Sequence, residues 1–151
     1  MDDVVAVQRL QAAYADVVSR RAWPELERLF LSDITVEVDT VSSPARSFTG
    51  PAEFVEFVSA ACERFDHFQF VILNSVIDVA GEQAAGRIFM CELRHETAID
   101  TWSTAYGLYS DRYRKVDGTW WFAERHYHSL ARTGPQEGIF GIPADLPQIG
   151  R

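Results

Sequence analysis

Three side chains combine a group that can exchange protons or hydrogen bonds with a position on an apolar segment: Tyr14, His67 and Glu92. His67 begins the run HFQFVIL, where an imidazole near neutrality can act as a general acid or base. Glu92 lies within IFMCEL, where a carboxylate is either buried with a partner or placed at an outward kink, because burial without a partner is costly. Together these groups indicate acid–base chemistry on a small molecule.

Each of these residues also has a purely structural interpretation. His67 can be a histidine at the start of a strand that bonds to backbone, and Tyr14 can be a core tyrosine with a satisfied hydroxyl. His126 and His128 share one face of a strand and could form half of a metal site, but no third ligand is evident. His95 has the opposite strand parity to Glu92 and should face away from it. We therefore expect no metal and no cofactor.

The two cysteines and two arginines also have simple interpretations. Cys62 and Cys91 lie in a chain without an evident export signal, so we expect buried thiols and no disulfide. Arg112 and Arg114 are predicted to lie on a solvated strand face.

The first half of the chain is mainly helical by its periodicity. Apolar residues recur at spacings of three and four between Asp2 and Arg20, which predicts a long amphipathic helix. Pro24 suits the first turn of a short second helix that ends at Ser32 and Asp33, and Pro51 opens a third helix that runs to about Arg64. Residues 34–39 alternate as a half-buried strand, and residues 40–50 are expected to form a loop.

The second half is predicted to consist of long antiparallel strands. Residues 67–79 are apolar on both parities, which indicates a strand covered on both faces, and residues 83–96 can pair back onto it. Residues 102–116 and 119–130 form a hairpin around Asp117 and Gly118. Trp120 and Trp121 have opposite parity, so one of them should lie on the outer face, where it suggests a subunit contact. The helices must pack on one face of this sheet, which makes the fold α+β.

Composition limits the classes of function. The chain has 151 residues, the size of one domain, with 47% hydrophobic residues and a formal net charge of -8. That charge argues against nucleic-acid binding, which needs clustered Lys and Arg. No stretch is long and apolar enough for a bilayer span, and the start MDDVVAVQRL is unlike a signal peptide, so a cytoplasmic protein with no membrane partner is expected.

Several segments together resemble the SnoaL-like family of the nuclear transport factor two superfamily: QAAYADVVSRRAWPELERLF, DHF, GRIFMCE and YSDRYRKVDGTWWF. The superfamily includes scytalone dehydratase, bile-acid 7α-dehydratase and ketosteroid isomerase. The resemblance covers roughly residues 4–130 and implies a cone-shaped, curved mixed sheet wrapped by three N-terminal helices. A pocket for a small molecule would lie at its open end.

The catalytic pattern of bile-acid dehydratase consists of a tyrosine, an aspartate, a histidine and a second aspartate, and this chain matches it only in part. Tyr14 and His67 match it, and Glu92 stands where a second aspartate is expected. Ser19 replaces the first aspartate, and Asp16, one turn earlier, projects about 60° away from Ser19 on a helix. The isomerase base would fall near Val38, whereas Asp39 points to the opposite face unless a bulge intervenes.

The resemblance therefore implies catalytic roles for His67, Glu92 and Tyr14, and we expect substrate contacts at Tyr109, Trp23 and Phe54. The prediction is a cofactor-independent, dehydratase-like lyase acting on a hydroxylated cyclic or polyketide-like compound. A non-catalytic binding or assembly subunit is the alternative, and an isomerase or cyclase ranks third. We expect a domain at residues 1–132, a Gly/Pro-rich tail at 133–151 that covers a pocket or lies loose, and a homodimer or homotrimer.

Overall fold

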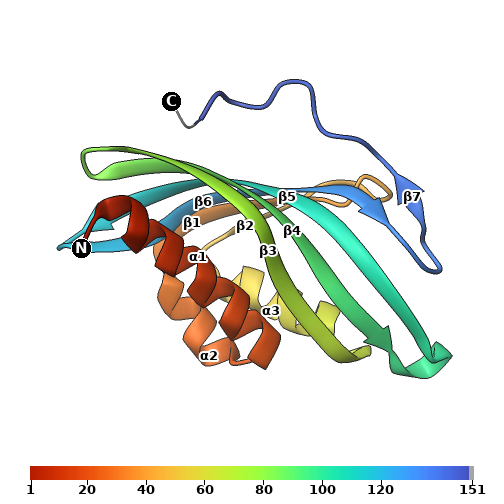
Figure 1. Ribbon diagram of the computed structural model, residues 1–151. Coiled ribbons are helices and arrows are strands. Elements are labelled where there is room, and N and C mark those ends of the chain that lie inside the picture. The colour runs from red at the N-terminus through yellow and green to blue at the C-terminus, as the bar shows by residue number, and fades with distance from the viewer. Residues whose placement is uncertain (150–151) are drawn as a thin grey trace.

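The computed structural model describes residues 1–149 and consists of a strongly curved sheet with all its α-helices on the concave face (Figure 1). The strand order is β2-β1-β6-β5-β4-β3, with β7 paired to β6. β1 and β6 run parallel and all other pairs are antiparallel, so the sheet is mixed, as predicted. The sheet does not close, because β2 and β3 are its two edges. The last two residues of the predicted tail, 150–151, lie outside the described part.

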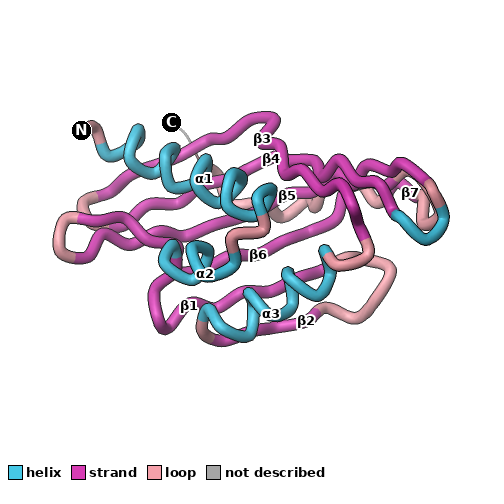
Figure 2. The backbone as a smooth tube through the Cα atoms, turned by 90° about the horizontal axis from the view of Figure 1, so that it is seen from below, coloured by secondary structure: helices cyan, strands magenta, loops and turns pink. Residues whose placement is uncertain are grey.

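The first and third helices lie where periodicity predicts them. α1 (Asp3–Arg20) begins after Asp2, whose carboxylate accepts a hydrogen bond of 2.8 Å from the backbone amide of Val4. α3 (Pro51–Cys62) begins at its proline, and both α1 and α3 cross the concave face (Figure 2).

The second helix is shorter than predicted. α2 (Trp23–Leu26) passes through a short 3-10 turn, η1 (Glu27–Leu29), into β1 (Phe30–Asp39). The prediction that this helix runs to Ser32 is wrong, because Phe30 already pairs with Phe122 of the parallel strand and is 4% exposed. Burial of this ring in the sheet overrides the helical spacing. Residues 46–49 form a short strand, β2 (Arg46–Thr49), inside the predicted loop.

Two long hairpins build most of the sheet. Their strands are β3 (Phe65–Ala80), β4 (Gln83–Glu96), β5 (Thr101–Val116) and β6 (Thr119–Arg132), and a 3-10 turn, η2 (Thr97–Ile99), precedes β5. Asp117 and Gly118 have φ angles of 50° and 78°, the left-handed geometry that a two-residue type I′ turn requires. The predicted hairpin is confirmed.

The edge strand β3 is not covered on both faces as its composition suggested. Phe68 and Phe70 are buried against the helices, whereas Leu73 on the outer face is 55% exposed. The outward-facing side chains of β3 are therefore partly open to solvent, and its apolar composition led to an overestimate of its burial.

Two bulges in β6 change which side chains face inward. Its pairing with β5 skips one residue at Ala123 and another at Leu130. Because each extra residue reverses the alternation, Arg132 pairs with Ala105 and shares the concave face with Ser129. The second bulge therefore adds a charged side chain to the interior at the end of the sheet.

The C-terminal segment crosses the convex face, opposite the helices (Figure 1). β7 (Gly138–Ile139) pairs with the end of β6, and Arg87 donates a hydrogen bond to the carbonyl of Pro147 further along. Leu108 faces outward on β5 but is 1% exposed because residues 143–149 lie beside it. Most of the tail thus lies along the outside of the sheet.

The two adjacent tryptophans take opposite faces, as predicted. The indole of Trp120 donates to Asp3 of α1 at 2.9 Å, while Trp121 pairs with Arg114 and is partly exposed on the outer face. A subunit contact at Trp121 remains a prediction. Within residues 1–149, no helix has the length and apolar character needed to span a membrane.

Candidate functional site

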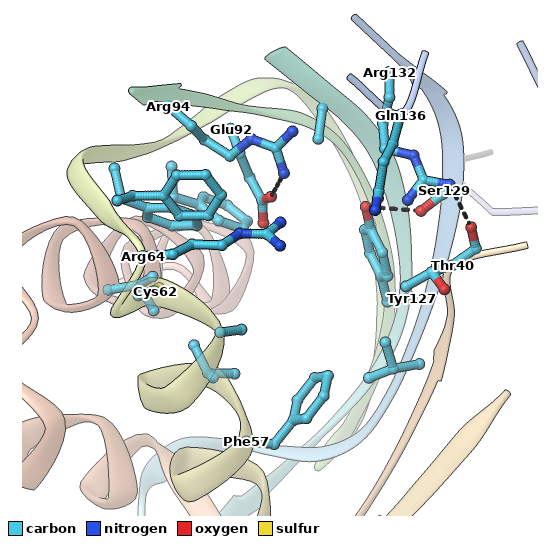
Figure 3. Close-up of a pocket in the computed structure, with 18 of the residues that line it drawn as sticks. Thr40, Phe57, Cys62, Arg64, Glu92, Arg94, Tyr127, Ser129, Arg132 and Gln136 are labelled. Atoms are coloured by element: carbon cyan, nitrogen blue, oxygen red, sulfur yellow. Dashed lines mark hydrogen bonds and ion pairs between the residues drawn. The ribbon is translucent and has the colours of Figure 1, made fainter. Parts of the chain in front are cut away.

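A cavity of about 260 Å³ opens between the sheet and helix α3 (Figure 3). Its inner part is apolar and aromatic, and its mouth is polar, with Thr40, Ser42 and Gln136 among the lining residues. Side chains from α1, α3 and all four long strands contribute to its walls. An apolar cavity with a few polar groups is the usual form of a small-molecule site.

Glu92 is the acidic residue of this cavity within the described chain. It projects from β4 into the cavity with a side chain that is 22% exposed. Burial raises the pKa of its carboxyl, while Arg94, Arg64 and Arg132 act in the opposite direction. The nearest guanidinium atom, Arg94 Nη1, is 3.7 Å from Glu92 Oε1, which is a loose contact. A carboxyl with a raised pKa and a loose partner can both take up and release a proton.

Two tyrosines form the inner end of the cavity. Tyr14 of α1 and Tyr109 of β5 are 2% and 6% exposed, and their ring centroids lie 6.1 Å apart. Burial raises the pKa of both phenols, so both hydroxyls stay protonated at neutral pH. Each can therefore donate a hydrogen bond to a substrate oxygen.

A buried ion pair, Arg125 with Asp111, packs against both tyrosine rings. Arg125 Nε and Nη2 bond to the carboxylate of Asp111 at 2.8 and 3.1 Å, and both side chains are fully buried. The guanidinium carbon lies 3.8 Å from the Tyr109 ring centroid and 4.2 Å from that of Tyr14. Burial is the largest influence and lowers the pKa of Arg125, but Asp111, Tyr14 and Tyr109 together raise it by more, so the guanidinium stays charged. The pair fixes both tyrosines and does not itself line the cavity.

The opposite wall comes from β6. The Ser129 hydroxyl donates to the Tyr127 hydroxyl at 3.3 Å, and burial raises the pKa of Tyr127. Arg132 lies near the mouth, where it donates to the Thr40 carbonyl at 2.9 Å (Figure 3). This wall offers donors facing Glu92 across the cavity.

The structure brings together four of the six residues singled out from the sequence. Tyr14, Glu92, Tyr109 and Phe54 all line the cavity. Trp23 does not; it is partly buried against the core at the start of α2.

His67 also lies outside the cavity, contrary to expectation. It is exposed on the opposite face of β3, with its ring 5.5 Å from that of Trp102. The reason is strand parity. Phe68 and Phe70 face the helices, so the neighbouring His67, which follows the bulge at residue 66, faces outward. Tyr14, His67 and Glu92 do not converge.

Ser19 and Asp16 have local structural contacts. The Ser19 hydroxyl accepts a hydrogen bond of 2.9 Å from the backbone amide of Phe70 and so satisfies part of the exposed edge of β3. Asp16 pairs with Arg20 one turn away at 2.9 Å. Neither residue lines the cavity.

The isomerase geometry is not present at β1. Val38 lines the cavity, whereas Asp39 lies on the outer face with its carboxylate 3.4 Å from His128 Nδ1. No bulge reverses this part of β1, because its register with β6 is continuous from Thr35 to Asp39. The isomerase interpretation therefore lacks its base.

The remaining histidines are peripheral to the cavity. His126 and His128 lie on the outer face beside Glu37 and Asp39, and residues 1–149 contain no group of three His, Cys, Asp or Glu side chains placed to hold a metal ion. His95 faces away from Glu92, as predicted, and bridges Asp66 and Asp100.

Both cysteines are buried free thiols, as predicted. Cys62 lines the cavity, but burial raises the pKa of its thiol to about 12, so the nucleophilic thiolate is scarce at neutral pH. Burial also raises the pKa of Cys91.

Reasoning from the sequence missed Arg94, Arg132, Tyr127 and Ser129. Arg94 could have been found, because it has the same parity as Glu92 on one strand. Tyr127 and Ser129 likewise share parity with each other. Arg132 could not, since its orientation depends on the bulge at Leu130.

Comparisons with known proteins agree with this architecture. The family model of the SnoaL-like domain matches residues 1–126. A search of curated protein sequences finds no match.

Solved structures share the fold at low sequence identity. A putative scytalone dehydratase from Novosphingobium aromaticivorans has a TM-score of 0.80 at 22% identity, covering 97% of this chain and 95% of that one. The hexachlorocyclohexane dehydrochlorinase LinA-type3 from Novosphingobium barchaimii has a TM-score of 0.76 at 18% identity, covering 93% and 95%. A putative dehydratase of the NTF2-like family from Streptomyces avermitilis has a TM-score of 0.73 at 16% identity, covering 85% and 97%.

Proposed function

Because this chain belongs to the SnoaL-like domain family, we propose that it is a cofactor-independent lyase in which Glu92 transfers the proton. Its substrate would be a small hydroxylated cyclic or polyketide-like compound. The observation that carries the proposal is the position of Glu92: a carboxyl with a raised pKa, loosely paired, in an aromatic cavity that is open to a ligand. The dehydratase and dehydrochlorinase names of the structural neighbours support an elimination reaction.

The proposed step needs only the side chains of the cavity. The ionised Glu92 carboxylate removes a proton from the carbon next to the one that bears the hydroxyl. The electron pair of that C–H bond forms a C=C bond as the C–O bond breaks. Glu92 returns its proton to the departing hydroxide, which leaves as water, so the carboxylate is regenerated. Tyr14 and Tyr109 would donate hydrogen bonds to a substrate carbonyl that accepts negative charge in the transition state.

A conservative variant tests the role of Glu92. Glu92→Gln keeps the shape but removes the proton acceptor, so turnover of hydroxylated cyclic ketones and polyketide-like alcohols should fall by about 10² to 10⁴-fold. The appearance of the conjugated C=C bond by ultraviolet absorbance measures the rate. Glu124→Gln, an exposed carboxylate on the outer face, is the matched control and should retain the wild-type rate. Full turnover in Glu92→Gln would refute the proposal.

One observation favours a second candidate, a non-catalytic binding protein. The lining of the cavity contains no histidine in the described chain, and Ser19 bonds to backbone outside it. A binding protein would hold the same compounds, seen as quenching of tyrosine and tryptophan fluorescence, without converting them. Binding without any product in long incubations would favour this candidate over the lyase.

A further inference from the structure

The mouth of the cavity carries more positive charge than its own carboxylate balances. Within the described chain, its charged lining residues are Arg64, Arg94, Arg132 and Glu92, three cations and one anion. The whole protein has a formal net charge of -8, so this local excess has the opposite sign to the molecule. Such a local field attracts and orients an anionic ligand.

The three arginines come from separate elements and line the same cavity. Arg64 follows α3, Arg94 belongs to β4 and Arg132 to the end of β6. All three guanidinium groups lower the pKa of the Glu92 carboxyl, which projects into the same cavity. Figure 3 shows Arg64 and Arg94 on the wall that carries Glu92, and Arg132 on the opposite wall.

The existing contacts of Arg94 and Arg132 leave some of their hydrogen-bond donors unused. Arg132 donates to the Thr40 carbonyl and the Ser42 hydroxyl but forms no ion pair among residues 1–149, and its buried Nε has no hydrogen-bond partner there. Arg94 donates to Ser103 at 3.2 Å and meets Glu92 only at 3.7 Å. Arg94 is also largely buried, with a side chain 12% exposed. Partly buried, incompletely paired guanidinium groups favour an added anion because desolvation strengthens the attraction.

We propose that Arg94 and Arg132, with Arg64 at the rim, bind a carboxylate of the substrate, so that the cavity selects cyclic compounds carrying an acid group. The aromatic interior would take the ring system and the mouth would take the acid. This assignment rests on the proposed function, in that it names the class of substrate presented to Glu92. It also makes a binding prediction that needs no turnover.

The test compares 2-naphthoate with 2-naphthamide, which has the same ring system without the charge. Isothermal titration calorimetry on the full chain should show that the acid binds at least about tenfold more tightly, because hydrogen bonds from a guanidinium to a carboxylate are stronger than those to a neutral amide. The preference should weaken as salt is raised. Arg132→Gln and, separately, Arg94→Gln should each reduce it, while Arg114→Gln on the outer face should retain it.

Two additional measurements separate loss of the subsite from loss of folding and from failure of the proposed function. Far-ultraviolet circular dichroism checks that each variant is folded, and Arg94→Gln serves if loss of Arg132 disturbs the segment near Thr40. Glu92→Gln should bind 2-naphthoate more tightly than wild type, because it removes a negative charge beside the subsite. If Glu92→Gln binds the acid more tightly yet keeps full turnover, the proposed function fails and the subsite stands.

Equal affinity for acid and amide, or no measurable binding of the acid, would overturn the subsite. So would an acid preference that survives in both arginine variants. Loss of turnover in Glu92→Gln together with equal affinities would leave the proposed function standing alone.

Discussion

Two arginine–carboxylate pairs lie on the same concave face of the sheet, and they differ in how closely the charged groups approach and in whether they line the cavity. Arg125 and Asp111 make two short hydrogen bonds and are fully buried beneath aromatic rings. Glu92 and Arg94 approach only to 3.7 Å beside an open cavity. The first pair does not line the cavity, although the buried Arg125 Nη1 has no hydrogen-bond partner among the described residues, whereas the second pair presents a titratable carboxyl and a guanidinium to the cavity. The same residue types therefore serve structure in one place and, in our proposal, chemistry in the other.

Breaking the fully buried Arg125–Asp111 pair should give the largest effect. Arg125→Met leaves the Asp111 carboxylate buried without its cation, so the free energy of unfolding should fall by about 3–5 kcal/mol in urea titrations. Arg114→Met, which removes an exposed partner of Asp33, is the control and should cost about 0–1 kcal/mol. Similar losses in the two variants would show that the buried pair contributes no more than an exposed one.

Adding a methyl group at Gly107, against the Tyr127 ring in the cavity wall, should have an intermediate effect on stability. A Cβ at Gly107 would lie 2.3 Å from the Tyr127 ring, so Gly107→Ala forces the ring or the strand to move. We expect a loss of about 1–3 kcal/mol in unfolding free energy from overpacking, and weaker binding of aromatic ligands as Tyr127 shifts. Ser110→Ala, on the outer face of the same strand, is the control. Wild-type stability in Gly107→Ala would mean that this wall is loosely packed.

The smallest effect is expected at a third kind of charged cluster, on the outside of the sheet. His95 Nδ1 lies 2.6 Å from Asp66, and hydrogen bonds to Asp66 and Asp100 raise the pKa of the imidazole. A group whose folded pKa is raised stabilises the protein below its unfolded value of about 6.5 and loses that contribution as pH rises through the folded value. His95→Ala should therefore lower the Tm at pH 5.5 but hardly at pH 9. A larger loss at pH 9 would reverse the sign of this linkage.

Sequence periodicity was sufficient for most of the fold. The 3.6-residue spacing in α1 and the Asp117-Gly118 turn are local signals, so both elements agree with prediction. The end of the second helix was not predictable in this way, because Phe30 joins β1 through a contact with Phe122, which lies far away in the sequence.

The candidate site was predictable only where parity and resemblance agree. Glu92 has the inward parity of its strand and Tyr14 lies on the apolar face of its helix; both match the resemblance, and both line the cavity. His67 was chosen for its position at the start of an apolar run and by the resemblance, although its parity opposes that of Phe68, and the structure follows parity. Arg132 depends on a bulge, a feature that arises from pairing between strands and leaves no recognisable signal in a single sequence.

The most direct test of the account is the titration of the Glu92 side-chain carboxyl by ¹³C NMR, with Glu92→Gln used to assign its signal. Burial should place its pKa above the ordinary glutamate value of about 4.5, as expected for a carboxyl that can exchange a proton with a substrate. A pKa at or below that value would contradict the account. It would mean that the surrounding arginines hold Glu92 as a permanent ion-pair partner, and that the cavity pair is structural in the same sense as Arg125 and Asp111.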